Sequence, residues 1–130
     1  MTIELKKVRS SYFSDEAQEN EVYDYHCYDI IAGGETVGTV DLIDRLCEDE
    51  DDNDICYIER IDVYEQYRNR GIGTEVLTSS LYDSGYRTVI VAPDNEDAKR
   101  LYERIGQEYT YNGAGVDFGY NDQGYGVYSI

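Results

Sequence analysis

The sequence predicts an α/β fold in a single domain, built on a mixed sheet whose central pair of parallel strands is flanked by helices. Two apolar, strand-like segments, Ile55–Tyr64 and Thr88–Ala92, lie on either side of a segment with helical spacing. A strand, a helix and a second strand in this order typically form a parallel pair joined by a crossover helix. A hairpin signal precedes this unit and adds further strands. The chain has 130 residues, which is enough for one core and too few for two domains.

The first part of the chain favours strands. Ile3–Val8 suits a first strand, and the polar segment Ser10–Glu21 has room for only one short helix. Val22–Ile31 and Val37–Leu46 contain many β-branched, aromatic and aliphatic residues. They are joined through Gly33-Gly34, a dipeptide typical of tight hairpin turns. We therefore expect an antiparallel hairpin after the first strand.

Two helices are expected in the second half. The first begins after Gly71 and ends at Gly85, because glycine readily adopts the left-handed conformation that caps a helix. The second follows Asn95, a residue suited to the N-cap, and is expected to end at Gly106. The remaining segment, Tyr109–Ile130, is rich in glycine, tyrosine and asparagine and suits two more strands with a long connection.

The chain is strongly acidic, with a formal net charge of −17 at pH 7. This charge repels nucleic acid and anionic membranes, so neither is an expected partner. It attracts cations such as an amine, a polyamine or a basic protein surface, although adaptation to high salt explains it equally well. The acidic run Glu48–Asp54 is expected to be a solvated loop. It does not match a calcium-binding loop, because Asp54 stands where glycine is needed and Arg60 where the closing glutamate should be.

The three cysteines, Cys27, Cys47 and Cys56, have neither metal-ligand nor redox spacing. An odd number of cysteines fits a reducing, intracellular setting. The segment Met1–Lys7 lacks the apolar core of a signal peptide, and no apolar run approaches the roughly 18 residues that span a membrane. We therefore expect a cytoplasmic protein without a metal site. The single histidine, His26, is expected to be an ordinary strand residue.

The most informative segment is Ile61–Thr74, in which an apolar strand leads into a basic turn and then into a helix. Gly71 and Gly73 let the backbone approach a phosphate that a Cβ atom would block. Backbone N–H groups at the start of a helix bind anions, and the helix dipole adds to the attraction. Most of the chain's basic residues also fall within the span from Arg60 to Arg104. The segment therefore predicts a turn that binds a pyrophosphate.

Two motifs occur together in this region. The first is Val63 followed by Tyr67-Arg68-x-x-Gly71-Ile72-Gly73, and the second is Asn95-x-x-Ala98-x-x-Leu101-Tyr102-x-x-x-Gly106. In this order, with a buried strand between them, they resemble the GNAT superfamily of N-acetyltransferases. The resemblance implies the acyl-CoA N-acyltransferase fold, in which the mixed sheet is mostly antiparallel. Because the family usually has two helices between its first two strands, it also implies a shortened N-terminal helical region here and an open acceptor site.

The resemblance implies acetyl-CoA as the acetyl-donor co-substrate. In the family, a strand hydrogen-bonds the pantetheine arm, and the turn that follows binds the pyrophosphate through backbone amides. The matching cofactor-binding residues are Ile61, Val63, Arg68, Asn69, Arg70, Gly71, Ile72, Gly73 and Thr74, together with Asn95. For some of them a plainer interpretation stays open: Arg68 and Arg70 merely flank the turn, Thr74 caps the helix, and Asn95 is only an N-cap.

Two residues are candidates for catalysis. Tyr102 matches the family's frequent general acid, which returns a proton to the departing CoA thiolate, but a tyrosine on the apolar stripe of a helix is also a typical core residue. Glu59 matches a position that some members use as a base acting through water. It shares a face with Tyr57 and Ile61 if no bulge intervenes, and a surface charge is the competing interpretation. Asp62 is a further candidate for binding the positive charge of the amine.

Together these features predict an N-acetyltransferase that moves the acetyl group of acetyl-CoA directly to a primary amine. A protein lysine, a protein N-terminus or a polyamine suits the acidic and open acceptor half. Two other functions remain open: a non-catalytic acyl-CoA-binding module, and an acidic inhibitor or decoy of a basic protein. Dimers are common in the family, so a homodimer is compatible with the resemblance.

Overall fold

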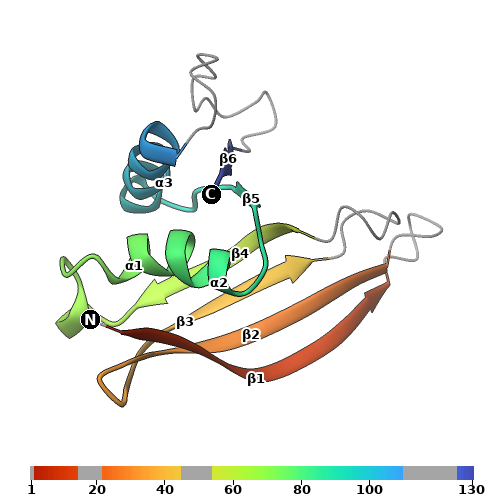
Figure 1. The fold of residues 1–130 in the computed structure, drawn as a ribbon, viewed down its shortest axis with the longest axis horizontal. Coiled ribbons are helices and arrows are strands. Elements are labelled where there is room, and N and C mark those ends of the chain that lie inside the picture. The colour runs from red at the N-terminus through yellow and green to blue at the C-terminus, as the bar shows by residue number, and fades with distance from the viewer. Residues whose placement is uncertain (1, 15–21, 45–53, 110–125) are drawn as a thin grey trace.

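The computed structural model describes residues 2–14, 22–44, 54–109 and 126–130. Within these ranges the strands form one six-stranded sheet in which spatial order follows chain order (Figure 1). The strands are β1 (Ile3–Ser14), β2 (Val22–Ala32), β3 (Glu35–Asp44), β4 (Ile55–Val63), β5 (Thr88–Val91) and β6 (Gly126–Ser129). All neighbours pair antiparallel except β4 and β5, which are parallel. The mixed, mostly antiparallel sheet with one parallel pair is therefore confirmed.

The hairpin between β2 and β3 forms where it was expected. Ala32 pairs with Glu35, so Gly33 and Gly34 make a two-residue turn. Their φ angles are +59° and +81°. A tight turn with two positive φ angles matches the right-handed twist of the flanking strands, and glycine adopts it without a steric penalty.

β1 is longer than the sequence indicated. It continues through Ser10 to Ser14, and this extension pairs with β2 down to the Ser14–Val22 pair. The first part of Ser10–Glu21 is therefore strand and not helix, because partners on β2 are available along its whole length. The rest of that segment lies outside the described residues. Of the two strands expected within Tyr109–Ile130, β6 is described and the other lies outside the described residues.

One helix with a π-helical turn in its middle links β4 to β5. It consists of α1 (Ile72–Glu75), the π-helical turn η3 (Val76–Ser80) and α2 (Leu81–Asp83). The carbonyl of Leu77 in the π turn accepts a hydrogen bond of 2.7 Å from the hydroxyl of Tyr128 on β6. At the other end, Gly85 has a φ of +101° and its N–H bonds the carbonyl of Tyr82, while the N–H of Tyr86 bonds the carbonyl of Leu81. This pair of bonds is a Schellman motif, so the predicted cap at Gly85 is confirmed.

The last helix, α3 (Glu96–Tyr109), begins at its predicted cap. The Oδ1 atom of Asn95 accepts a hydrogen bond of 2.8 Å from the backbone N–H of Ala98. The expected end at Gly106 is wrong, because the helix continues for three more residues. Gly106 is not among the residues with positive φ, and a glycine ends a helix in this way only when it turns left-handed.

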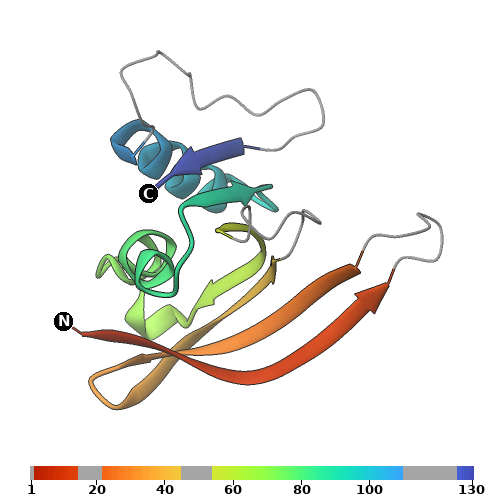
Figure 2. The same ribbon diagram turned by 45° about the vertical axis from the view of Figure 1, so that its right-hand side comes forward.

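The core lies between the sheet and the helices. The segment from α1 to α2 runs over the face of β1–β4, and α3 lies beside β6, as Figures 1 and 2 both show. Apolar side chains from both layers are fully or almost fully buried, among them Ile30, Val40, Leu42, Ile58, Val76, Leu77, Leu81 and Ile105. No helix among the described residues is long and apolar enough to cross a membrane.

Candidate active site

The parallel strands β4 and β5 separate halfway along β4. They pair only from Ile55 to Ile58, opposite Thr88 to Val91, whereas β4 stays paired with β3 as far as Val63. In an antiparallel pair, successive residues direct their backbone polar groups to opposite edges of the strand. Because the N–H of Tyr64 bonds the carbonyl of Val37, the polar groups of Val63 and Ile61 point toward the edge that β5 has left. We call this stretch, residues 59–63, the unpaired edge of β4.

A β-bulge lies at Glu59, where the unpaired edge begins. On β3, Leu42 pairs with Ile58 and its predecessor Asp41 pairs with Arg60, so Glu59 is the extra residue on β4. A bulge inserts one residue and so reverses the side-chain alternation beyond it. The side chain of Glu59 is exposed.

The bulge overturns one expectation from the sequence. Glu59, Tyr57 and Ile61 were expected to share a face only in the absence of a bulge. Instead, Ile61 lies opposite the buried Val40 and packs against the core, on the same face as Ile58. Tyr57 belongs to the other face. No local pattern in the sequence signals this insertion.

The turn that follows β4 has the backbone shape expected of an anion-binding loop. Asn69 and Gly71 have φ angles of +63° and +77°. The backbone N–H groups of residues 69–74 make no hydrogen bond with any residue that the structure describes, and α1 has no side-chain cap. Consecutive N–H groups in such a conformation form a concave, positively polarised surface at the helix N-terminus.

Two residues of the turn also contribute to packing. The side chain of Ile72 is buried in the core, so only its backbone faces the turn. A Cβ atom at Gly73 would lie 3.3 Å from the Cδ2 atom of Leu101, so this glycine permits close packing of α1 against α3.

Three arginines surround the turn. Arg68 is directed back to β4, where its Nε donates to the carbonyl of Val63 at 2.8 Å and its guanidinium lies 3.4 Å from Asp62. The guanidinium of Arg70 lies over the ring of Tyr67, 5.8 Å from the ring centre. Arg104, which the motifs did not single out, reaches from α3 to within 3.5 Å of the hydroxyl of Thr74. Its place on the turn follows from the packing of α3 against α1.

The remaining predicted site residues have positions that a structural role explains. The side-chain oxygen of Asn95 is used as the N-cap of α3. Tyr102 lies on the buried face of α3 and is 4% exposed. Asp62 has Arg68 as an ionic partner, which reduces its ability to bind the charge of an amine.

A match to a protein-family model identifies the family that this unpaired edge and turn belong to. The model described as "Acetyltransferase (GNAT) family" matches residues 3–107, most of the chain. The chain belongs to the GNAT family of acetyltransferases. Members of this family use acetyl-CoA as the acetyl donor. A search of curated proteins finds no match for this GNAT chain.

Several solved structures are similar to this chain, and the first of those below supports the GNAT fold. An acetyltransferase from Thermus thermophilus is 18% identical, with a TM-score of 0.55, and the match covers 82% of this chain and 64% of that one. A GNAT acetyltransferase from Elizabethkingia anophelis with acetyl-CoA bound is 22% identical over 68% of this chain and 54% of its own, with a TM-score of 0.46. A Bacillus subtilis acetyltransferase in complex with CoA is 21% identical over 63% and 53%, with a TM-score of 0.46. This chain therefore spans less than two thirds of each of these proteins.

Proposed function

We propose that this GNAT chain is an N-acetyltransferase that transfers the acetyl group of acetyl-CoA directly to a primary amine. The observation that carries the proposal is the run of backbone N–H groups at residues 69–74, free of protein partners among the described residues, next to the unpaired edge of β4. One surface offers hydrogen-bond donors to a pyrophosphate, and the other offers strand-like hydrogen bonds to an amide-containing arm. Acetyl-CoA contains both groups in sequence.

Each part of acetyl-CoA has a candidate contact in the protein. The N–H groups of residues 69–74 suit the pyrophosphate, and Arg70 and Arg104 supply positive charge at the rim. The polar groups of Ile61 and Val63 suit the pantetheine arm, although the carbonyl of Val63 must release Arg68 to bind it. That release would also free the guanidinium of Arg68 for a phosphate.

Proton transfer completes the proposal. Glu59, at the bulge beside the unpaired edge, takes a proton from the incoming ammonium group through water. Tyr102 returns a proton to the departing thiolate. Positioning of the two substrates supplies roughly 7–11 kcal/mol of barrier reduction, and a single general acid or base supplies roughly 10²–10⁴-fold in rate. Orientation by the turn and the strand edge therefore contributes more than either side chain.

The acceptor is proposed to be a cationic amine: a protein lysine, a protein N-terminus or a polyamine. The net charge of −17 attracts such a molecule. A cytoplasmic setting is proposed as well, because the described cysteines Cys27 and Cys56 are both free thiols and buried.

A second candidate is a GNAT module that binds acyl-CoA without catalysis. The observation that favours it is the burial of Tyr102, whose side chain is almost fully enclosed in the core. The two candidates share the binding step and differ in turnover. Release of CoA that depends on an added polyamine or lysine peptide supports the enzyme, and tight binding without such release supports the module.

The binding step is tested by calorimetric titration with acetyl-CoA, CoA and dephospho-CoA. Gly71→Ala and Gly85→Ala form a matched pair, because both glycines have positive φ and a Cβ at either would meet nothing within 4 Å. Both variants carry a similar backbone strain of about 1–2 kcal/mol. We expect Gly85→Ala to bind like the wild type and Gly71→Ala to bind at least about tenfold more weakly, a loss of about 1.4 kcal/mol. Equal affinities of the two variants for acetyl-CoA would show that the turn is not part of the binding site.

A further inference from the structure

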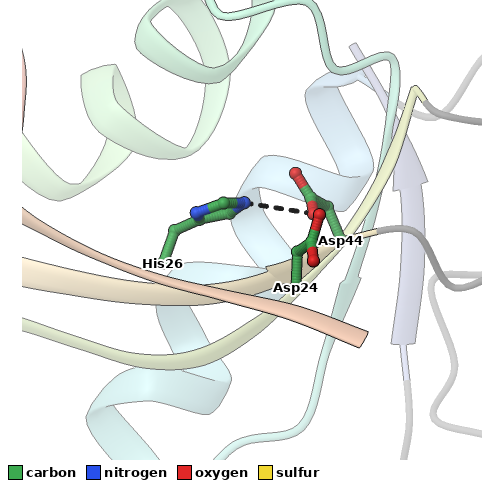
Figure 3. A group of neighbouring side chains, drawn as sticks. All are labelled: Asp24, His26 and Asp44. Carbon is green, nitrogen blue, oxygen red and sulfur yellow. Dashed lines mark hydrogen bonds and ion pairs between the residues drawn. The ribbon is translucent and has the colours of Figure 1, made fainter. Parts of the chain in front are cut away.

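A cluster of three potential metal ligands lies away from the turn at residues 69–74. Asp24 and His26 on β2 and Asp44 on β3 bring one ligand atom each to within 4.8 Å of one another (Figure 3). All three residues are partly buried. The cluster sits beside the start of β4, because the neighbouring Ile43 pairs with Tyr57, whereas the turn follows the end of that strand. The six residue steps from Tyr57 to Val63 correspond to about 20 Å along the strand.

The strand register explains how the three side chains meet. Asp24 and Asp44 are direct cross-strand partners. His26 is two residues further along β2 and so faces the same side of the sheet as Asp24. Two like charges directly opposite each other destabilise a sheet unless something between them compensates. A bound cation would convert this repulsion into ligation.

The distances suit a small divalent cation. The Nε2 atom of His26 lies 3.2 Å from the Oδ1 atom of Asp44. In a tetrahedral zinc site with bonds of about 2.0–2.1 Å, two ligand atoms are roughly 3.3 Å apart. The pair is therefore spaced as two ligands of one ion already are. In Figure 3 the imidazole and both carboxylates converge on one point beside the sheet.

Two further polar atoms of the cluster, one on His26 and one on Asp44, are held by outer hydrogen bonds. The Nδ1 atom of His26 is 2.9 Å from the hydroxyl of Ser10 on β1. The hydroxyl of Tyr86 donates to the Oδ2 atom of Asp44 at 2.6 Å. Metal-binding histidines usually donate their second ring N–H to such a partner, and metal-binding carboxylates are usually hydrogen-bonded in the same way. These bonds leave Nε2 and Oδ1 facing each other.

Nearby basic side chains do not neutralise Asp44. Within the described part of the chain, its partners are His26 and Tyr86, and no lysine or arginine pairs with it. Lys7, on the neighbouring strand, lies over the ring of Tyr28. Arg87 packs against the ring of Tyr82, 3.8 Å from its centre. Among the described residues, a positive charge beside Asp44 therefore comes from His26 or from a metal ion.

We propose that Asp24, His26 and Asp44 form a binding site for one divalent transition-metal ion, with zinc as the best match to one imidazole and two carboxylate ligands. The fourth position of the tetrahedron is left for water. The ion would tie β2 to β3 and, through Ser10 and Tyr86, would also connect β1 and the segment that leads into β5.

The test uses Zn²⁺ with the whole chain, in the presence of excess Mg²⁺ to occupy weak carboxylate sites on the acidic surface. We expect one equivalent of Zn²⁺ to bind and to raise the melting temperature. The single histidine of the chain gives one set of imidazole nitrogen signals in the NMR spectrum. Saturating Zn²⁺ is expected to shift the Nε2 signal of His26, and an unmoved signal would overturn the site.

Variants separate this site from adventitious binding. His26→Gln and Asp44→Asn are expected to abolish the one-equivalent binding, while Ser10→Ala is expected to weaken it roughly 10–100-fold. Asp29→Asn is the matched control, because Asp29 lies on β2 but faces the other side of the sheet. Zn²⁺ affinity that is unchanged in His26→Gln and Asp44→Asn would assign the binding to the acidic surface. The NMR readout on the wild type decides the matter if a variant does not fold.

Discussion

A Cβ atom at Gly38 would overlap the carbonyl oxygen of Asp62, so β3 and β4 approach each other here more closely than any side chain allows. The same Cβ would lie 3.0 Å from the Cα atom of Val63, the residue that pairs with Gly38. This contact fixes the end of β4 against β3, just where β4 has lost its other partner, β5. Glycine at this position therefore allows β3 to pair with β4 beside the unpaired edge.

Gly38→Ala is expected to destabilise the protein by about 1–3 kcal/mol, toward the upper end because backbone atoms and not a flexible side chain must move. The free energy of unfolding from urea titration measures the effect. Gly33→Asn is the control, since a Cβ there meets nothing within 4 Å and asparagine tolerates the turn conformation. Equal stability of Gly38→Ala and the wild type would show that the strands can separate without cost.

Tyr102→Phe is expected to lower kcat by roughly 10²–10⁴-fold while leaving the affinity for acetyl-CoA unchanged. The ring of Tyr102 stays packed in the core, so only the hydroxyl is lost. Tyr82→Phe removes a hydroxyl from an exposed tyrosine and should not change the rate. Full kcat in Tyr102→Phe would mean that Tyr102 is a core residue and not the general acid.

Glu59→Gln is expected to slow acetyl transfer by roughly 10²-fold, because the incoming ammonium group would lose its base. The comparison is with Glu65→Gln, another exposed glutamate, which lies on the short 3-10 turn η2 (Glu65–Tyr67). Steady-state kinetics with a lysine peptide or a polyamine measures both variants. If both keep wild-type rates, Glu59 is only a surface charge.

Stability is expected to fall as the pH rises above about 9. Burial, with a smaller contribution from Asp44, raises the pKa of the Cys56 thiol from 9.0 to about 12. Below pH 9 the thiol is protonated in both the folded and the unfolded state, so its contribution to the free energy of unfolding is fully present there. Between about pH 9 and pH 12 the unfolded thiol ionises and the folded one does not, so the free energy of unfolding falls.

The slope from this single group approaches about 1.4 kcal/mol per pH unit. Urea titrations of the wild type and of Cys56→Ala across this range measure it. The variant should show a shallower decline, because tyrosines such as Tyr86, whose pKa is also raised by burial, still contribute to both proteins. Identical slopes would mean that the buried thiol does not govern the alkaline transition.

Local features of the chain were predictable because their causes lie within a few residues. The two-glycine hairpin, the Schellman cap at Gly85 and the N-cap at Asn95 each depend on the backbone preferences of one short segment. The turn that ends at Thr74 belongs to the same group, and its motif was enough to indicate the family. Gly106 is the exception, because a glycine is compatible with a continuing helix when neighbouring contacts favour it.

Features that depend on strand register could not be predicted from the sequence. The bulge at Glu59, the approach of Gly38 to Asp62 and the pairing of Asp24 with Asp44 are all relations between strands. A strand's alternation shows which residues share a face, but not which residue of another strand lies opposite. Register is set by the packing of whole strands against a common core, so no short segment contains it. For that reason the fold and the backbone shape of the turn at residues 69–74 could be predicted from the sequence, whereas only the folded sheet brought His26 to the two aspartates.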